Sequence, residues 1–136
     1  MSAILSDEFY SKIKEVLLKD KRYRADAYAF VFQALDYTVK KVVKERRHLS
    51  GQELLQGIKG FALEQFGPLS KLVFTLWGVR QTSDFGSIVF NLVEKKLMGK
   101  TDQDNIEDFK DVYDFDEVFN MENILRSNKR SSDQTD

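Results

Sequence analysis

The chain has 136 residues, of which 42% are hydrophobic and 32% charged, a composition typical of one folded domain. It has no cysteine and a single histidine, which excludes disulfides, thiol nucleophiles and the usual zinc sites. The formal net charge is only −1, but residues 1–100 carry 17 Lys and Arg against 11 Asp and Glu, whereas residues 101–136 carry 4 against 11. The two signs of charge are therefore segregated along the chain.

The sequence predicts a soluble, cytoplasmic protein without a membrane partner. Asp7 and Glu8 stand where a secretory signal would need an apolar stretch. The apolar runs are all shorter than the roughly 18 residues of a membrane span.

Apolar residues recur at helical spacing through most of the chain, which predicts a mainly α fold. A first helix begins at Ser6, whose hydroxyl can cap it, and runs to about residue 22. A second helix spans residues 25–47. The third begins at a capping box formed by Ser50 and Glu53.

The second half of the chain continues the helical pattern. Gly67 and Pro68 end the third helix and begin a short fourth helix that reaches residue 77. Its inward face is predicted to be Leu69, Leu72, Val73 and Leu76. A fifth helix is expected to be capped by Thr82 or Ser83 and to end before Gly99. After an acidic loop, a short β element or irregular segment near residues 109–115 is expected to dock on the body and to lead into a last helix over residues 116–125.

We therefore expect a compact single-domain bundle of five or six helices over residues 1–125, followed by a disordered polar tail over residues 126–136. Its middle resembles a helix-turn-helix, because residues 69–97 predict two helices joined by a turn that contains Gly78. Asp84 and Ser87 stand where that motif usually has apolar residues, and Asp84 would repel phosphate. We expect the shape without the DNA contact.

Five cations gather at the end of the second predicted helix: Lys40, Lys41, Lys44, Arg46 and Arg47. They could form a patch for a phosphate or an acidic partner. The negative end of a helix dipole also favours cations, so a solvated helix end is the simpler account.

Residues for catalysis and metal binding are scarce. His48 is interpreted as a turn residue, because nothing nearby marks a nucleophile or its base. The acidic loop from Thr101 lacks the glycine and the glutamate that an EF-hand needs. We expect no catalytic residue, metal or cofactor. Gly57 and Gly60, both inside the third helix, are better explained by close helix packing than by a ligand.

Residues 22–119 contain, in this order, the segments DAYAFVFQALDYT, HLSGQELLQGI, QFGPLSKLVFTLWGV, TSDFGSIVFNLVEKKLMGKTD and EDFKDVYDFDEVF. With these segments the chain resembles a small bacterial family of uncharacterised proteins named from a Methylacidiphilum member. The resemblance implies one domain and no activity. The clustering of its motif positions suggests that the last segment folds back to close the domain or to form a shallow site. That site would comprise Trp77, Arg80, Asp84, Asn91, Tyr113 and Asp114.

The leading function hypothesis is a non-catalytic macromolecular interaction module with a protein partner, because the residues for chemistry are missing. The alternative is a nucleic-acid-binding, winged-helix-like protein that uses Arg80 and the five cations and is restrained by its acidic C-terminal segment. That alternative predicts nucleic-acid binding by a chain ending before Asp102. An enzyme is the third class, which an apolar pocket converging on Arg80 and Asp84 would favour.

Overall fold

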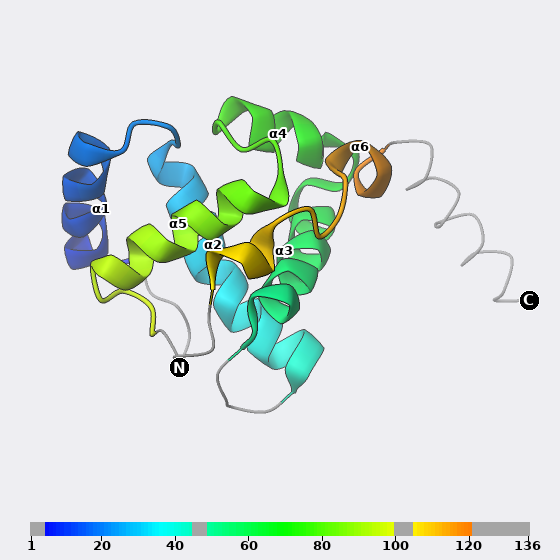
Figure 1. Cartoon of the computed structure of the whole chain (residues 1–136), viewed down its shortest axis with the longest axis horizontal. Coiled ribbons are helices and arrows are strands. Elements are labelled where there is room, and N and C mark those ends of the chain that lie inside the picture. The colour runs from blue at the N-terminus through cyan, green and yellow to red at the C-terminus, as the bar shows by residue number, and fades with distance from the viewer. Residues whose placement is uncertain (1–4, 45–48, 100–104, 121–136) are drawn as a thin grey trace, which may run out of the picture.

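The computed structural model describes residues 5–44, 49–99 and 105–120, and within these ranges it is helical without a strand (Figure 1). The α-helices are α1 (Asp7–Lys19), α2 (Ala25–Thr38), α3 (Gly51–Phe66), α4 (Ser70–Leu76), α5 (Thr82–Glu94) and the single turn α6 (Phe115–Val118). The other helical segments are the π-helix η1 (Val39–Val43) and the 3-10 helices η2 (Gly67–Leu69) and η3 (Ile106–Phe109). The mainly α prediction is confirmed. No helix in the described ranges is long and apolar enough to cross a membrane.

Some of the predictions concern residues outside the described ranges. These residues are Arg46 and Arg47 of the basic patch, His48, the end of the last predicted helix, and the polar tail over residues 126–136.

Helix α2 forms the centre of the bundle and contacts α1, α3 and α5 (Figure 1). Its side chains Ala27, Tyr28, Val31 and Ala34 are fully buried. Helix α3 crosses it closely at Gly57, where a Cβ atom would overlap the Thr38 hydroxyl group. Close helix packing therefore explains Gly57, as the sequence analysis favoured.

The predicted caps of α1 and α3 are present. The Ser6 hydroxyl accepts a hydrogen bond from the Phe9 N–H at 3.1 Å. Ser50 and Glu53 form the reciprocal capping box, with donor–acceptor distances of 3.1 and 2.9 Å. Helix α5 differs, because its N-cap residue is Gln81 and not the predicted Thr82 or Ser83. The Asp84 carboxylate in its first turn accepts from the Arg80 and Gln81 N–H groups at 2.8 and 3.2 Å.

Replacing Ser50 with alanine is expected to lower the free energy of unfolding by about 1 kcal/mol, because the Glu53 N–H loses its acceptor at the start of α3. Urea denaturation of the variant and the wild-type protein measures this difference. Serine-to-threonine replacement at the same position keeps the acceptor oxygen and is the control, with a smaller loss expected.

The regular part of α2 ends nine residues before the predicted end of that helix. From Val39 the backbone continues as the π-helix η1, and the Lys44 N–H donates to the Val39 carbonyl at 2.8 Å. Lys44 itself adopts a left-handed conformation with φ of 64°. The change of helix type alters the directions in which the lysines of this segment project.

The acidic C-terminal segment is docked on the body, as predicted, but it forms no β element. Residues 106–109 form the 3-10 helix η3, and α6 follows at Phe115. The reason is local capping: Asn105 accepts from the Glu107 N–H, and Asp114 accepts from the Asp116 N–H, which favours helical turns over extended backbone. The alternative of an irregular segment is the one that the structure bears out.

Phe109 anchors this segment between α3 and α5. A Cβ atom added at Gly51 would lie 2.9 Å from the Phe109 ring, and one added at Gly86 would lie 2.8 Å from the Phe109 Cβ. The two glycines therefore make room for this side chain. The Val112 N–H also donates to the Thr82 hydroxyl at 3.1 Å. The segment is thus part of the core and not a removable tail.

Helix α4 buries a different face from the one predicted. Leu69, Leu72 and Leu76 are 56, 55 and 63% exposed, whereas Ser70 and Phe74 are fully buried. The Ser70 hydroxyl is satisfied by the Ala62 and Gly67 carbonyls, which it contacts at 3.1 and 2.8 Å. Burial of the larger Phe74 ring among other aromatic rings decides the orientation, and the buried serine keeps a hydrogen bond.

Candidate functional site

The outward side of α4 and η2 carries an apolar surface that we call the leucine face, made of Leu69, Leu72 and Leu76. Their spacing of three and four residues places them along one side of the helix, opposite Phe74. The other large apolar side chains that are exposed in the described part of the chain lie on other elements: Tyr10, Leu18, Val42 and Ile106. Contiguous apolar surface of this kind often marks a binding site.

Helix α6 lies beside α4 (Figure 1). Residues of α6 and Lys71 of α4 line an acidic hollow between them. Lys71, the neighbour of Leu72, forms an ion pair with Asp116. The hollow has a volume of about 530 Å³. Its charged lining residues are Lys71, Arg80, Asp111, Asp114, Asp116 and Glu117, so acidic groups outnumber basic ones.

The shallow site predicted from the sequence is only partly assembled. Arg80, Tyr113 and Asp114 line this acidic hollow together. Trp77 packs instead on Phe30, Phe66 and Phe74. Asp84 accepts hydrogen bonds from the Arg80 N–H and from the Tyr23 hydroxyl, the latter at 2.7 Å. The six predicted residues therefore belong to several local structures.

Tyr113 has a structural contact that accounts for its burial. Its hydroxyl donates to the Leu55 carbonyl at 2.7 Å, and its ring lies near the Lys59 ammonium group. Burial raises the pKa of Tyr113 above its ordinary value. In this position Tyr113 ties the C-terminal segment to α3.

Asn91 joins α5 to the C-terminal end of α1 and to α2 through a polar network. Its amide donates to the Asp20 carboxylate at 3.0 Å and to the Tyr28 hydroxyl at 2.9 Å. The Arg22 guanidinium donates two hydrogen bonds to Asp20, at 2.9 and 2.8 Å. These hydrogen bonds hold the pKa of Asp20 well below its usual range, and the bonds from Arg22 have the largest effect.

The lowered pKa of Asp20 predicts a pH-dependent contribution to stability. The contribution is full above about pH 4, the ordinary pKa of an aspartate, and it is lost as the pH falls toward the lower pKa of the folded state. The Asp20→Asn variant should therefore be less stable than the wild-type protein at pH 7, and the difference should shrink at pH 3. Urea denaturation at the two pH values tests this, and a difference that grows at pH 3 would contradict it.

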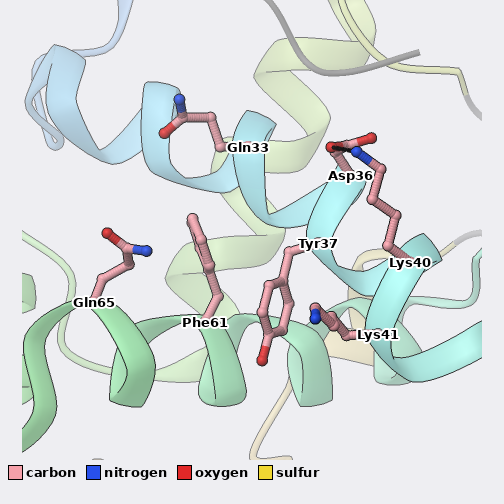
Figure 2. A pocket seen from close by; sticks show the side chains of 7 residues that line it. All are labelled: Gln33, Asp36, Tyr37, Lys40, Lys41, Phe61 and Gln65. Atoms are coloured by element: carbon pink, nitrogen blue, oxygen red, sulfur yellow. Dashed lines mark ion pairs between the residues drawn. The ribbon is translucent and has the colours of Figure 1, made fainter.

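A second concave region, which we call the α2–α3 groove, lies between α2 and α3 next to η1 (Figure 2). It has a volume of about 350 Å³. Its lining residues are Gln33, Asp36, Tyr37, Lys40, Lys41, Phe61 and Gln65. Lys40 and Lys41 belong to the predicted basic patch. The aromatic and amide residues of the groove were missed in the sequence, although Gly60, against which the Tyr37 hydroxyl packs, was noted.

The lysines of the basic patch do not meet the acidic C-terminal segment. Lys40 forms an ion pair with Asp36 at 2.9 Å, one turn earlier on α2. Within the described ranges, no ion pair joins Lys40, Lys41 or Lys44 to residues 105–120. The proposed restraint of a basic patch by the acidic segment therefore has no support in these contacts.

Helices α4 and α5 follow each other through a short turn, as the predicted helix-turn-helix requires. The N-terminal part of α5 is nevertheless covered, because Thr82 and Phe85 are buried and Phe109 packs on Gly86. A recognition helix must present this part to the bases. The arrangement gives no support for nucleic-acid binding through α5.

In the described part of the chain, no group of three or more acidic or histidine side chains has the arrangement of a metal site. Comparisons with protein-family models, with curated proteins and with solved structures find no match. The resemblance of residues 22–119 to the uncharacterised bacterial family thus stays a prediction from its motifs.

Proposed function

We propose that this protein is a non-catalytic module that binds another protein through the leucine face. The observation that carries this proposal is the exposure of Leu69, Leu72 and Leu76, each more than half exposed on one side of a helix. Fully burying a leucine contributes about 1.5–3 kcal/mol relative to leaving it exposed. Burial of these three leucines by a partner would therefore contribute several kcal/mol to the free energy of binding.

The packing of α4 supports a role for these leucines outside the core. The helix is held by Phe74 and by the Ser70 hydrogen bonds, so the leucines are not needed for its attachment. Polar residues at the three positions would suit a helix surface exposed only to water. A partner surface explains the apolar residues that are found there instead.

The surroundings of the leucine face define the chemistry of the partner. A typical stable interface buries about 800 Å² on each side, more than the two turns of α4 offer, so the partner must also cover a neighbouring surface. On the side of Lys71 that surface is the acidic hollow of α6. We therefore expect an amphipathic helix whose apolar stripe covers the leucines and whose Lys or Arg side chains face Asp114 and Asp116.

The proposal is tested with the full chain in three forms. The double variant Leu72→Glu/Leu76→Glu places two charges on the leucine face, and Leu18→Glu is the matched control because Leu18 is 78% exposed on α1. Proteins captured from cells by the wild-type chain are purified and titrated against all three forms. We expect a captured protein whose direct binding weakens at least about tenfold with the double variant, stays unchanged with the control and weakens in high salt.

Two results would overturn the proposal. Equal binding of the captured protein by the wild-type chain and the double variant would place the interface elsewhere. A wild-type dimer in light scattering that the double variant abolishes would show that a second copy of this chain covers the leucines.

A further inference from the structure

The sign of the charge reverses in the sequence directly after Asn120, where the described part of the chain ends. Residues 105–120 contain six Asp and Glu and one Lys, whereas residues 121–130, with the sequence MENILRSNKR, contain three Lys and Arg and one Glu. We call residues 121–130 the basic segment. A cluster of cations next to a cluster of acids indicates that the two stretches of chain attract each other.

The basic segment also carries apolar side chains. Its apolar residues recur at positions i, i+3 and i+4, and its cations repeat this helical spacing. The apolar residues are Met121, Ile124 and Leu125, and the cations are Arg126, Lys129 and Arg130. An apolar stripe flanked by Lys and Arg is the chemistry that the leucine face and the acidic hollow require of a partner. The chain thus contains a match to that partner in its own sequence.

The basic segment begins close to α4. Phe119, two residues before it, is 2% exposed, and the centroid of its ring lies 5.4 Å from that of Phe74 on α4. Five extended residues span about 17 Å, which exceeds the roughly 10–12 Å diameter of a helix. The segment can therefore reach the opposite side of α4, where Leu72 is 55% exposed.

We propose that the basic segment covers the leucine face of its own chain and competes there with the partner protein. Its apolar stripe packs on the three leucines, and its cations face Asp114 and Asp116 in the acidic hollow. The competition rests on the proposed function of the leucine face, whereas the contact within the chain does not.

Attachment to the same chain allows a weak contact to be effective. A short linker gives the attached segment an effective concentration of about 1 mM. A contact with a dissociation constant of about 0.1 mM between separate molecules would therefore be about 90% formed within one chain. A partner that binds only the open face would then bind about tenfold more weakly than it does when the segment is absent from the face.

Alkylation of a single thiol tests this contact on the full chain. The chain has no cysteine, so an introduced thiol reports on one site. Thr75→Cys places the thiol at an exposed position of α4, one turn after Lys71 and three residues after Leu72, and it keeps all three leucines. Ser11→Cys, at an exposed position of α1, is the matched control.

We expect N-ethylmaleimide to alkylate the Thr75→Cys chain at least about fivefold faster when Ile124→Glu/Leu125→Glu is added, because this change removes the apolar contact of the segment. The rate of the Ser11→Cys chain should stay the same. Ser131→Glu/Ser132→Glu adds the same charge beyond the basic segment and should leave the Thr75→Cys thiol protected. High salt should weaken the protection, since it screens exposed charges.

Two results of the alkylation would overturn the proposal. Equal rates for the Thr75→Cys chain with and without Ile124→Glu/Leu125→Glu would show that the segment does not cover the face. Protection that grows with protein concentration would show that a second copy supplies the cover. Circular dichroism checks that the helices of each variant are intact.

The alkylation requires no partner, so its failure is distinguishable from a failure of the proposed function. The protein captured by the leucine face tests the competition separately. It should bind the Ile124→Glu/Leu125→Glu variant at least about fivefold more tightly than the wild-type chain, and equal binding would contradict the competition.

Discussion

Replacing Phe74 with alanine is expected to lower the free energy of unfolding by about 3–5 kcal/mol, a large part of the stability of a small domain. The Phe74 side chain is fully buried, and its ring contacts are Phe30, Phe66, Trp77, Phe85, Phe115 and Phe119. These rings belong to α2, α3, α5 and α6 as well as to the turn after α4. Removal of Phe74 leaves a cavity where five parts of the chain meet.

The neighbouring residue Leu72 provides the matched control for this prediction. Leu72→Ala removes an apolar side chain from the same helix, but at a site that is 55% exposed, so its cost should be below about 1 kcal/mol. Urea denaturation of both variants measures the two costs. If Leu72→Ala were the more destabilising change, α4 would present the opposite face to the core, and the leucine face would not exist.

The second large effect is expected at Phe109. Phe109→Ala should cost about 3–5 kcal/mol, because the ring fills the space between α3 and α5 and attaches the acidic segment to both. The loss should also expose residues 105–119, which is measurable as faster amide hydrogen exchange in η3 and α6. Phe109→Leu, which fills most of the space, should cost less.

A double-mutant cycle with Gly86 tests the contact itself. Gly86→Ala alone should destabilise the protein, because its methyl group would lie 2.8 Å from the Phe109 Cβ and helix α5 cannot move without losing its own packing. In the Phe109→Ala background the same change should cost much less, since the ring is gone and alanine favours the helix. Additive effects in the cycle would show that the two residues do not touch.

The candidate sites were predictable only in part. The run of lysines was visible in the sequence, but its place beside Tyr37 and Phe61 was not, because that neighbourhood depends on how α3 crosses α2 at Gly57. The sequence grouped six residues into one shallow site because they belong to the same motifs. In the structure their hydrogen bonds place them apart, since Asn91 bonds to Asp20 and Tyr28, whereas Tyr113 bonds to Leu55.

By itself the sequence determined the helical fold class, the caps at Ser6 and Ser50 and the docking of the acidic segment. These features follow from local spacing, from hydrogen bonds within three residues and from the number of apolar side chains. Only the tertiary structure decided which face of α4 is buried, because Leu72 and Phe74 lie on opposite sides of a helix that is apolar on both. That choice depends on ring contacts with four distant segments, which no local pattern records, and it is what leaves three leucines at the surface.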